Sequence, residues 1–100
     1  FKISPKTATP NGDGDDDNLL ISYEFDSAYI YLTVKIFNIK GQLIAMPING
    51  DYSSSSGNVV WNCRSESGKV IDTGAYICLL KAKDDNGKVK ELKEAFYIAK

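Results

Sequence analysis

A dense group of acidic residues near the start of the chain is the part of the sequence best suited to chemistry. Residues 10–18 hold four aspartates and two glycines, and Asn11, Asp13, Asp15 and Asp17 occupy alternate positions. Calcium loops present oxygen ligands at this spacing from a tightly curled backbone, and glycines permit such a curl. These four residues are therefore candidate ligands of a calcium cofactor, whereas magnesium demands a stricter octahedron and fits less well.

Loop shaping without a metal is the alternative explanation of the same residues. Asp13 and Asp17 would then accept hydrogen bonds from backbone N–H groups of the loop. The loop is not an EF-hand, because Ser22 stands where the twelfth-position glutamate would be. Catalysis by these carboxylates is not expected, since paired catalytic acids need a cleft that separates their pKa values.

Cys63 and Cys78 are the only cysteines, and two alternatives are open for them. Each shares a strand face with an aromatic residue, so both thiols are expected to point into a core. They form either one disulfide, which would close a loop of 15 residues and add roughly 3 kcal/mol, or two buried free thiols. A catalytic thiol is not expected, because the sequence contains no histidine to activate it.

The aromatic residues divide by strand face. Tyr29, Tyr31 and Phe37 are predicted to point outward, where they could bind a carbohydrate or contact a neighbouring domain. Cross-strand packing on a half-covered sheet face is the alternative explanation. The inward aromatics are predicted to belong to the core rather than to a ligand site: Tyr23, Trp61 and Tyr76.

Strands must position all of these residues, because every segment with a clear hydrophobic period has period two. The odd-numbered residues of segment 19–25 share one apolar face, and the even-numbered residues of segment 29–37 are expected to point inward. Segments 49–57 and 64–74 are predicted polar loops. The predicted strands cover residues 1–4, 19–25, 29–37, 42–48, 59–63, 75–83 and 89–99.

Seven short strands with turn signals between them predict an all-β fold, a seven-stranded immunoglobulin-like β-sandwich, with a small barrel as the alternative. One domain spanning residues 1–100 is expected. The formal net charge is −1 with scattered Lys and Arg, which argues against nucleic acid as a partner. No apolar run approaches 18 residues, so direct membrane insertion is not expected. Without histidine the commonest general base is absent, and an enzyme is not expected.

The order of short motifs resembles a known family. Pro10-Asn11-Gly12-Asp13-Gly14 comes first, followed by Val34-Lys35-Ile36-Phe37-Asn38, Val60-Trp61-Asn62 and Gly74-Ala75-Tyr76. This order resembles the immunoglobulin-like domain of bacterial flagellar hook-capping proteins. It is also similar to gliding-motility-associated C-terminal domains, whose parent proteins are often exported by type IX secretion. The family usually has Asp-Gly after the tryptophan, and Asn62-Cys63 here puts that turn in doubt.

The resemblance implies a non-catalytic accessory module at the C-terminus of a larger secreted or cell-surface bacterial protein. Such a module would serve export, anchoring or spacing outside the cell. Its expected partners are other domains of the parent protein, and the secretion machinery or a cell-surface glycan. Two alternative functions are open: a carbohydrate- or protein-binding module that uses the outward aromatics, and a flagellar hook-capping domain.

Overall fold

The structure is a computed structural model that describes the backbone of all residues except 11, 13–16 and 100, and the side chains of these residues and of 26–29 are not described. All regular secondary structure in the described part is β. The strands are β1 (Lys2–Ser4), β2 (Thr7–Ala8), β3 (Leu19–Asn38), β4 (Leu43–Trp61), β5 (Gly74–Asp84) and β6 (Val89–Ile98). Within the described ranges, no helix is long and apolar enough to cross a membrane.

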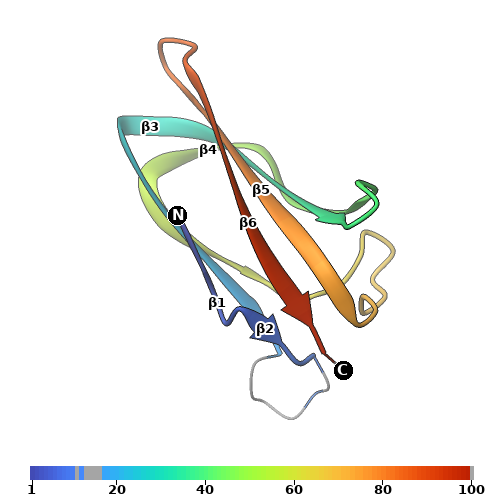
Figure 1. Ribbon diagram of the computed structural model, residues 1–100. Helices are drawn as coiled ribbons and strands as arrows, with labels where there is room; N and C mark the ends of the chain where they lie inside the picture. Colours follow the sequence, from blue (N-terminus) through green and yellow to red (C-terminus); the bar gives the residue numbers. More distant parts are fainter. Residues whose placement is uncertain (11, 13–16, 100) are drawn as a thin grey trace.

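Two long strands, β3 and β4, form an antiparallel hairpin that runs from the pair Leu19 and Trp61 to the pair Phe37 and Leu43. The Asn38 carboxamide oxygen closes the connecting turn by accepting the N–H groups of Lys40 and Gln42. The first half of β3 pairs with β1 and the second half with β5. A register shift separates the two halves, so the hairpin bends and serves both layers of the fold (Figure 1).

The hydrogen-bonded sheet therefore folds over on itself into a sandwich. One layer holds β1, the first half of β3 and the second half of β4. The other holds the first half of β4, the second half of β3, then β5, β6 and β2. In Figure 1, β5 and β6 lie side by side in front of the long bent strands. The predicted immunoglobulin-like β-sandwich is confirmed, with four of the predicted strands merged into two.

The core lies between the layers and follows the predicted faces. Leu19, Ile21 and Tyr23 are buried in the first half of β3, and the even-numbered residues from Ile30 to Ile36 are buried in the second half. Trp61, 5% exposed, contacts Phe96 edge-on across the layers, with ring centroids 6.0 Å apart. Burial of alternate apolar side chains on both sheets is the main stabilising contribution in such a fold.

The prediction that residues 49–57 form a loop is wrong, because this stretch belongs to β4. The register sets Tyr23 opposite Gly57, and the Tyr23 hydroxyl lies 2.8 Å from the Ser53 hydroxyl. Serine and glycine have weak β propensity. Pairing with β3 supplies the backbone hydrogen bonds that the local sequence does not predict.

Candidate functional site

The acidic opening loop is shaped by the one predicted calcium ligand that the structure describes. Asp17 Oδ1 accepts the backbone N–H of Gly12 at 3.0 Å, and Gly12 has a φ of +81°, which glycine adopts readily. This is the hydrogen bond that the loop-shaping explanation requires of Asp17. The other proposed ligands, Asn11, Asp13 and Asp15, lie outside the described residues, so calcium binding stays a prediction.

A groove of about 220 Å³ lies beside this loop, and Asp17, Asn62 and Arg64 contribute its polar groups. The Arg64 guanidinium donates to the carbonyl of Gly68 at 2.8 Å, which ties the side chain back to its own loop. In the described part of the chain, no three His, Cys, Asp or Glu side chains cluster closely enough to hold a metal ion. The groove is therefore an open polar depression at the end of the sandwich.

The turn after β4 is kept although a cysteine stands where the resembled family has glycine. Cys63 adopts a φ of +59°, in the left-handed region that costs an L-residue with a Cβ roughly 1–2 kcal/mol. Its carbonyl accepts the N–H of Ile71 at 3.1 Å, and Trp61 Nε1 donates to the carbonyl of Arg64 at 3.1 Å. These bonds hold the turn. The turn that the Asn62-Cys63 sequence put in doubt is therefore present, with the backbone of Cys63 in a strained conformation.

Both cysteines are free thiols in the structure, and both are fully buried. Burial, with a smaller contribution from the Asp17 charge, raises the pKa of Cys63 to about 11. Burial, with a smaller contribution from Glu94, raises the pKa of Cys78 to about 12. Both thiols are thus neutral at ordinary pH, and a neutral buried thiol is a poor nucleophile. Of the two alternatives, the structure contains the buried free thiols.

Tyr76, at the start of β5, makes a contact that sequence reasoning missed. Its hydroxyl donates to the backbone carbonyl of Asp72 at 2.7 Å, and its ring stacks on Phe96 with centroids 5.7 Å apart. Burial and then the Asp72 charge raise the pKa of Tyr76, which keeps the hydroxyl protonated as a donor. Immunoglobulin-like domains have such a tyrosine corner two residues before a core cysteine. The spacing of Tyr76 and Cys78 is the sequence pattern from which this contact could have been predicted.

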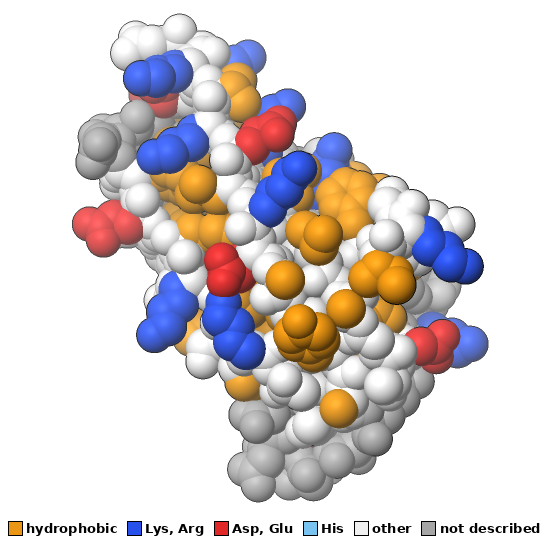
Figure 2. All heavy atoms as spheres, viewed as in Figure 1, with side chains coloured by type: hydrophobic (Ala, Val, Ile, Leu, Met, Phe, Trp, Pro, Cys, Tyr) orange, Lys and Arg blue, Asp and Glu red, His pale blue; other side chains and the backbone are white. Residues whose placement is uncertain are grey.

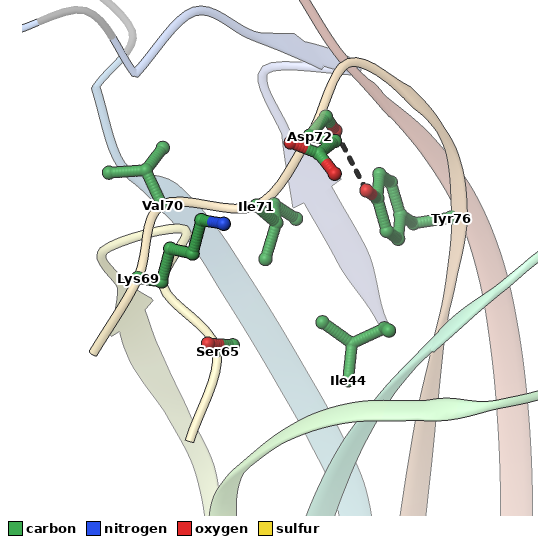
Figure 3. Close-up of a pocket in the computed structure, with 7 residues that line it drawn as sticks. All are labelled: Ile44, Ser65, Lys69, Val70, Ile71, Asp72 and Tyr76. Atoms are coloured by element: carbon green, nitrogen blue, oxygen red, sulfur yellow. Dashed lines mark hydrogen bonds between the residues drawn. The ribbon is translucent and has the colours of Figure 1, made fainter. Parts of the chain in front are cut away.

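Tyr76 also lines a groove of about 170 Å³ between the start of β4 and the loop before β5 (Figure 3). Ile44 and Ile71 give it an apolar wall, and Lys69 extends over it. The Ser65 hydroxyl lies 2.8 Å from the hydroxyl of Ser67, within its own loop. At about 170 Å³ the groove is smaller than the roughly 300–1,000 Å³ of ordinary ligand pockets.

Two of the predicted outward aromatics, Tyr31 and Phe37, lie far apart on β3. Tyr31 and Phe37 are six positions apart in β3, a separation of about 20 Å along a strand. Tyr31 packs on Tyr52 with ring centroids 4.8 Å apart, whereas Phe37 lies at the other end, between its register partners Leu43 and Ile77. The side chain of Tyr29 is outside the described residues. Tyr31 and Phe37 therefore lie in two separate parts of the surface, and binding by these aromatics stays a prediction.

An apolar band crosses the outer face of the larger sheet. It consists of Leu43, Phe37, Ile77 and Ala95, which the register aligns across four strands. Leu43 and Ile77 are 48% and 38% exposed. The neighbouring register row adds lysines 35 and 93 on the same face, and Figure 2 shows hydrophobic side chains over β5 and β6 with lysines around them. Sequence reasoning found only Phe37, because the band exists only once the strands are aligned.

The strand order and the packing of the two layers define an immunoglobulin-like β-sandwich. Residues 2–98 match the model of the CHU_C type IX secretion signal domain. The chain therefore belongs to this family of bacterial secretion signal domains. The predicted resemblance is confirmed, and the match makes the chain an export-related domain of secreted bacterial proteins. No curated protein matches the sequence closely enough to serve as a relative.

Solved structures share the fold. PorZ of Porphyromonas gingivalis, described as an essential surface component of the type IX secretion system, is 21% identical with a TM-score of 0.57, and the match covers 99% of this chain and 11% of PorZ. FlgD of P. aeruginosa is 19% identical with a TM-score of 0.60, covering 81% of this chain and 62% of FlgD. CopC of Methylosinus trichosporium OB3b is 14% identical with a TM-score of 0.58, covering 98% of this chain and 89% of CopC.

Proposed function

We propose that this chain is a non-catalytic module at the C-terminus of a larger bacterial protein, and that it directs that protein to the type IX secretion machinery. The parent protein would then be released or held at the cell surface. The match of residues 2–98 to the secretion signal family carries this proposal. Its partners are the secretion machinery and the other domains of the parent protein.

The geometry supports recognition of a folded surface rather than of a linear peptide. The secretion-family match covers nearly the entire sandwich, and the apolar band is assembled from residues far apart in sequence. A contiguous exposed apolar surface on a small domain commonly marks an interaction site. We therefore propose that the apolar band contacts the secretion machinery.

A reporter fusion tests the export role. Residues 1–100 would be attached to the C-terminus of a periplasmic reporter protein in a bacterium with a type IX system, and reporter activity outside the cell would be measured. The FlgD domain of the same fold is the matched control, and a strain without a working system is the second. Export by both domains alike, or by neither, would contradict the proposal.

The same assay locates the surface. Ile77→Glu puts a charge into the apolar band, and we expect reduced export with an unchanged melting temperature. Val89→Glu is the matched control, because Val89 is 47% exposed and lies on β6 beside Lys83, away from the band. Equal loss in both variants would place the contact elsewhere on the module.

Carbohydrate binding is a second candidate with one supporting observation. Tyr31 and Tyr52 are 46% and 55% exposed and lie against each other on the outer surface, and exposed tyrosine rings can stack on sugars. Retention on cell-surface glycans that Tyr31→Ala abolishes would support it, and absence of retention by the unaltered chain would exclude it. The hook-capping alternative is supported by the motif order and by the fold likeness to FlgD, whereas the family match favours export.

A further inference from the structure

Three lysines that are far apart in the sequence come together on the outer face of the larger sheet. The register places Lys35 and Lys93 on either side of Leu79, in one row across β3, β5 and β6. Lys81 lies two residues further along β5 and therefore on the same face as Leu79. Because neighbouring strands are about 4.8 Å apart and alternate residues about 7 Å apart, the three Cα atoms lie within about 10 Å of one another. These three lysines are hereafter the lysine cluster.

The positive charge of the lysine cluster is not compensated by ion pairs. In the described part of the chain, none of its ammonium groups forms an ion pair or a hydrogen bond. Glu91 stands opposite Lys81 in the register, but the two charged groups are not paired. Lys6, by contrast, is paired with Glu94. Charges at these separations repel one another, since the screening length in physiological salt is about 8 Å. Folding therefore gathers like charges that an anionic partner would neutralise.

The lysine cluster is continuous with the apolar band. The row of Leu79 adjoins the row of Ile77, which belongs to the band. Figure 2 shows hydrophobic side chains over β5 and β6 with basic side chains around them. An apolar centre with a polar or charged rim is the usual composition of a protein–protein interface. The lysine cluster and the apolar band thus form one surface of mixed character.

The shape of this surface favours an acidic protein over an anionic membrane. Lysine side chains are longer than those of Leu79 and Ile77, and Leu79 is half-buried between its neighbours. A flat lipid surface would therefore meet the ammonium groups first. The apolar side chains would then stay outside the acyl region, into which the apolar face of a membrane-bound element enters by about 5–10 Å. A protein surface can place carboxylates and apolar side chains at the two different depths.

We propose that the lysine cluster binds an acidic patch on a protein of the secretion machinery, whose apolar residues lie against the apolar band. This inference rests on the proposed export function and adds the charge of the partner to it. Binding relieves the repulsion among the three ammonium groups. Complementary charge raises the rate of association and fixes the orientation of docking. Export should therefore depend on the charge of the lysine cluster.

Neutralisation of the lysine cluster tests the inference in the reporter assay of the export role. A cluster variant that combines Lys35→Gln, Lys81→Gln and Lys93→Gln removes three positive charges, and export should fall by about tenfold or more. Arginine at the same three positions keeps the charge and should keep export. A control variant carries the same lysine-to-glutamine change at three exposed lysines outside the cluster and should be exported like the unaltered chain: Lys2, Lys88 and Lys90.

A binding measurement separates failure of this inference from failure of the export role. The purified 100-residue chain is applied to immobilised poly-L-glutamate at low salt and eluted with rising salt. The control variant should elute with the unaltered chain, and the cluster variant should elute earlier. Thermal melts check that both variants are folded.

Equal export of the cluster and control variants would overturn the inference and leave the export role intact. If the unaltered chain is not exported, the export role fails, and the elution order then decides whether the cluster binds carboxylates. Elution of the two variants together would overturn the cluster as a carboxylate-binding surface. Binding to phosphatidylglycerol vesicles that the cluster variant loses, with export unchanged, would overturn the protein partner and assign the lysines to a membrane.

Discussion

Replacement of Cys63 by alanine and by glycine tests whether the turn after β4 stores conformational strain. Cys63 has a φ of +59°, whereas Cys78 lies within strand β5. Both side chains are 0% exposed. The same pair of substitutions at Cys78 is thus a matched control that differs mainly in backbone conformation.

The expected magnitude follows from three contributions. At Cys78, glycine loses a buried Cβ worth roughly 0.8 kcal/mol relative to alanine, and it has an entropic cost of roughly 0.5–1 kcal/mol. Cys78→Gly should therefore be less stable than Cys78→Ala by about 1.5 kcal/mol. At Cys63 the same losses apply, but glycine also relieves roughly 1–2 kcal/mol of left-handed strain. The two Cys63 variants should therefore be nearly equal in stability.

Urea unfolding in the presence of a reducing agent, followed by the fluorescence of the single tryptophan, Trp61, measures the four free energies of unfolding. In thermal melts the Ala–Gly gap should be about 6–12 °C at Cys78, since 1 kcal/mol corresponds to roughly 4–8 °C in a domain of this size. At Cys63 the gap should be close to zero. An Ala–Gly gap at Cys63 as large as that at Cys78 would refute the strain argument.

Three further predictions concern the tyrosine corner, pH and calcium. Tyr76→Phe keeps the ring on Phe96 but loses the bond to the Asp72 carbonyl, so the free energy of unfolding should fall by about 1 kcal/mol; an unchanged urea midpoint would contradict this. The pKa of Cys63 is raised from 9.0 to about 11, so the unfolded chain loses this proton first as pH rises. The contribution of Cys63 to the free energy of unfolding should therefore be constant below pH 9 and fall as pH rises through 11. This fall should shrink in the Cys63→Ala, Cys78→Ala double variant. If residues 11–17 bind calcium, millimolar calcium should raise the melting temperature and a chelator should reverse the rise; a midpoint that does not move leaves loop shaping by Asp17 as the explanation.

The faces of the core could be predicted from sequence because side-chain alternation is a local property. Odd positions in 19–25 and even positions in 29–37 were expected inward, and Ile21 and Val34 are both fully buried. The number of separate strands could not be predicted, because whether two strands merge depends on partners elsewhere in the fold. β3 continues through residues 26–29 because β4 pairs with it on both sides of this stretch.

The candidate sites were predicted less completely than the fold. The Asp17 role in loop shaping followed from residue type and spacing, since Asp–backbone bonds in tight turns are short-range. The left-handed Cys63 and the tyrosine corner of Tyr76 depend on partners such as Ile71 and Asp72, whose positions follow from the folded loop. The apolar band depends on register across four strands, which a linear sequence does not display.

By itself the sequence determined the all-β class, the inward faces and the kinship with secretion signal domains. Side-chain alternation and the order of short motifs are local properties, so they can be found without knowing which strands pair. Only the tertiary structure decided that the serine-rich stretch 53–56 is part of strand β4. It also decided that Cys63 holds a glycine-like turn. The reason is the same in both cases: hydrogen bonds to a neighbouring segment outweigh local preferences of about 1 kcal/mol.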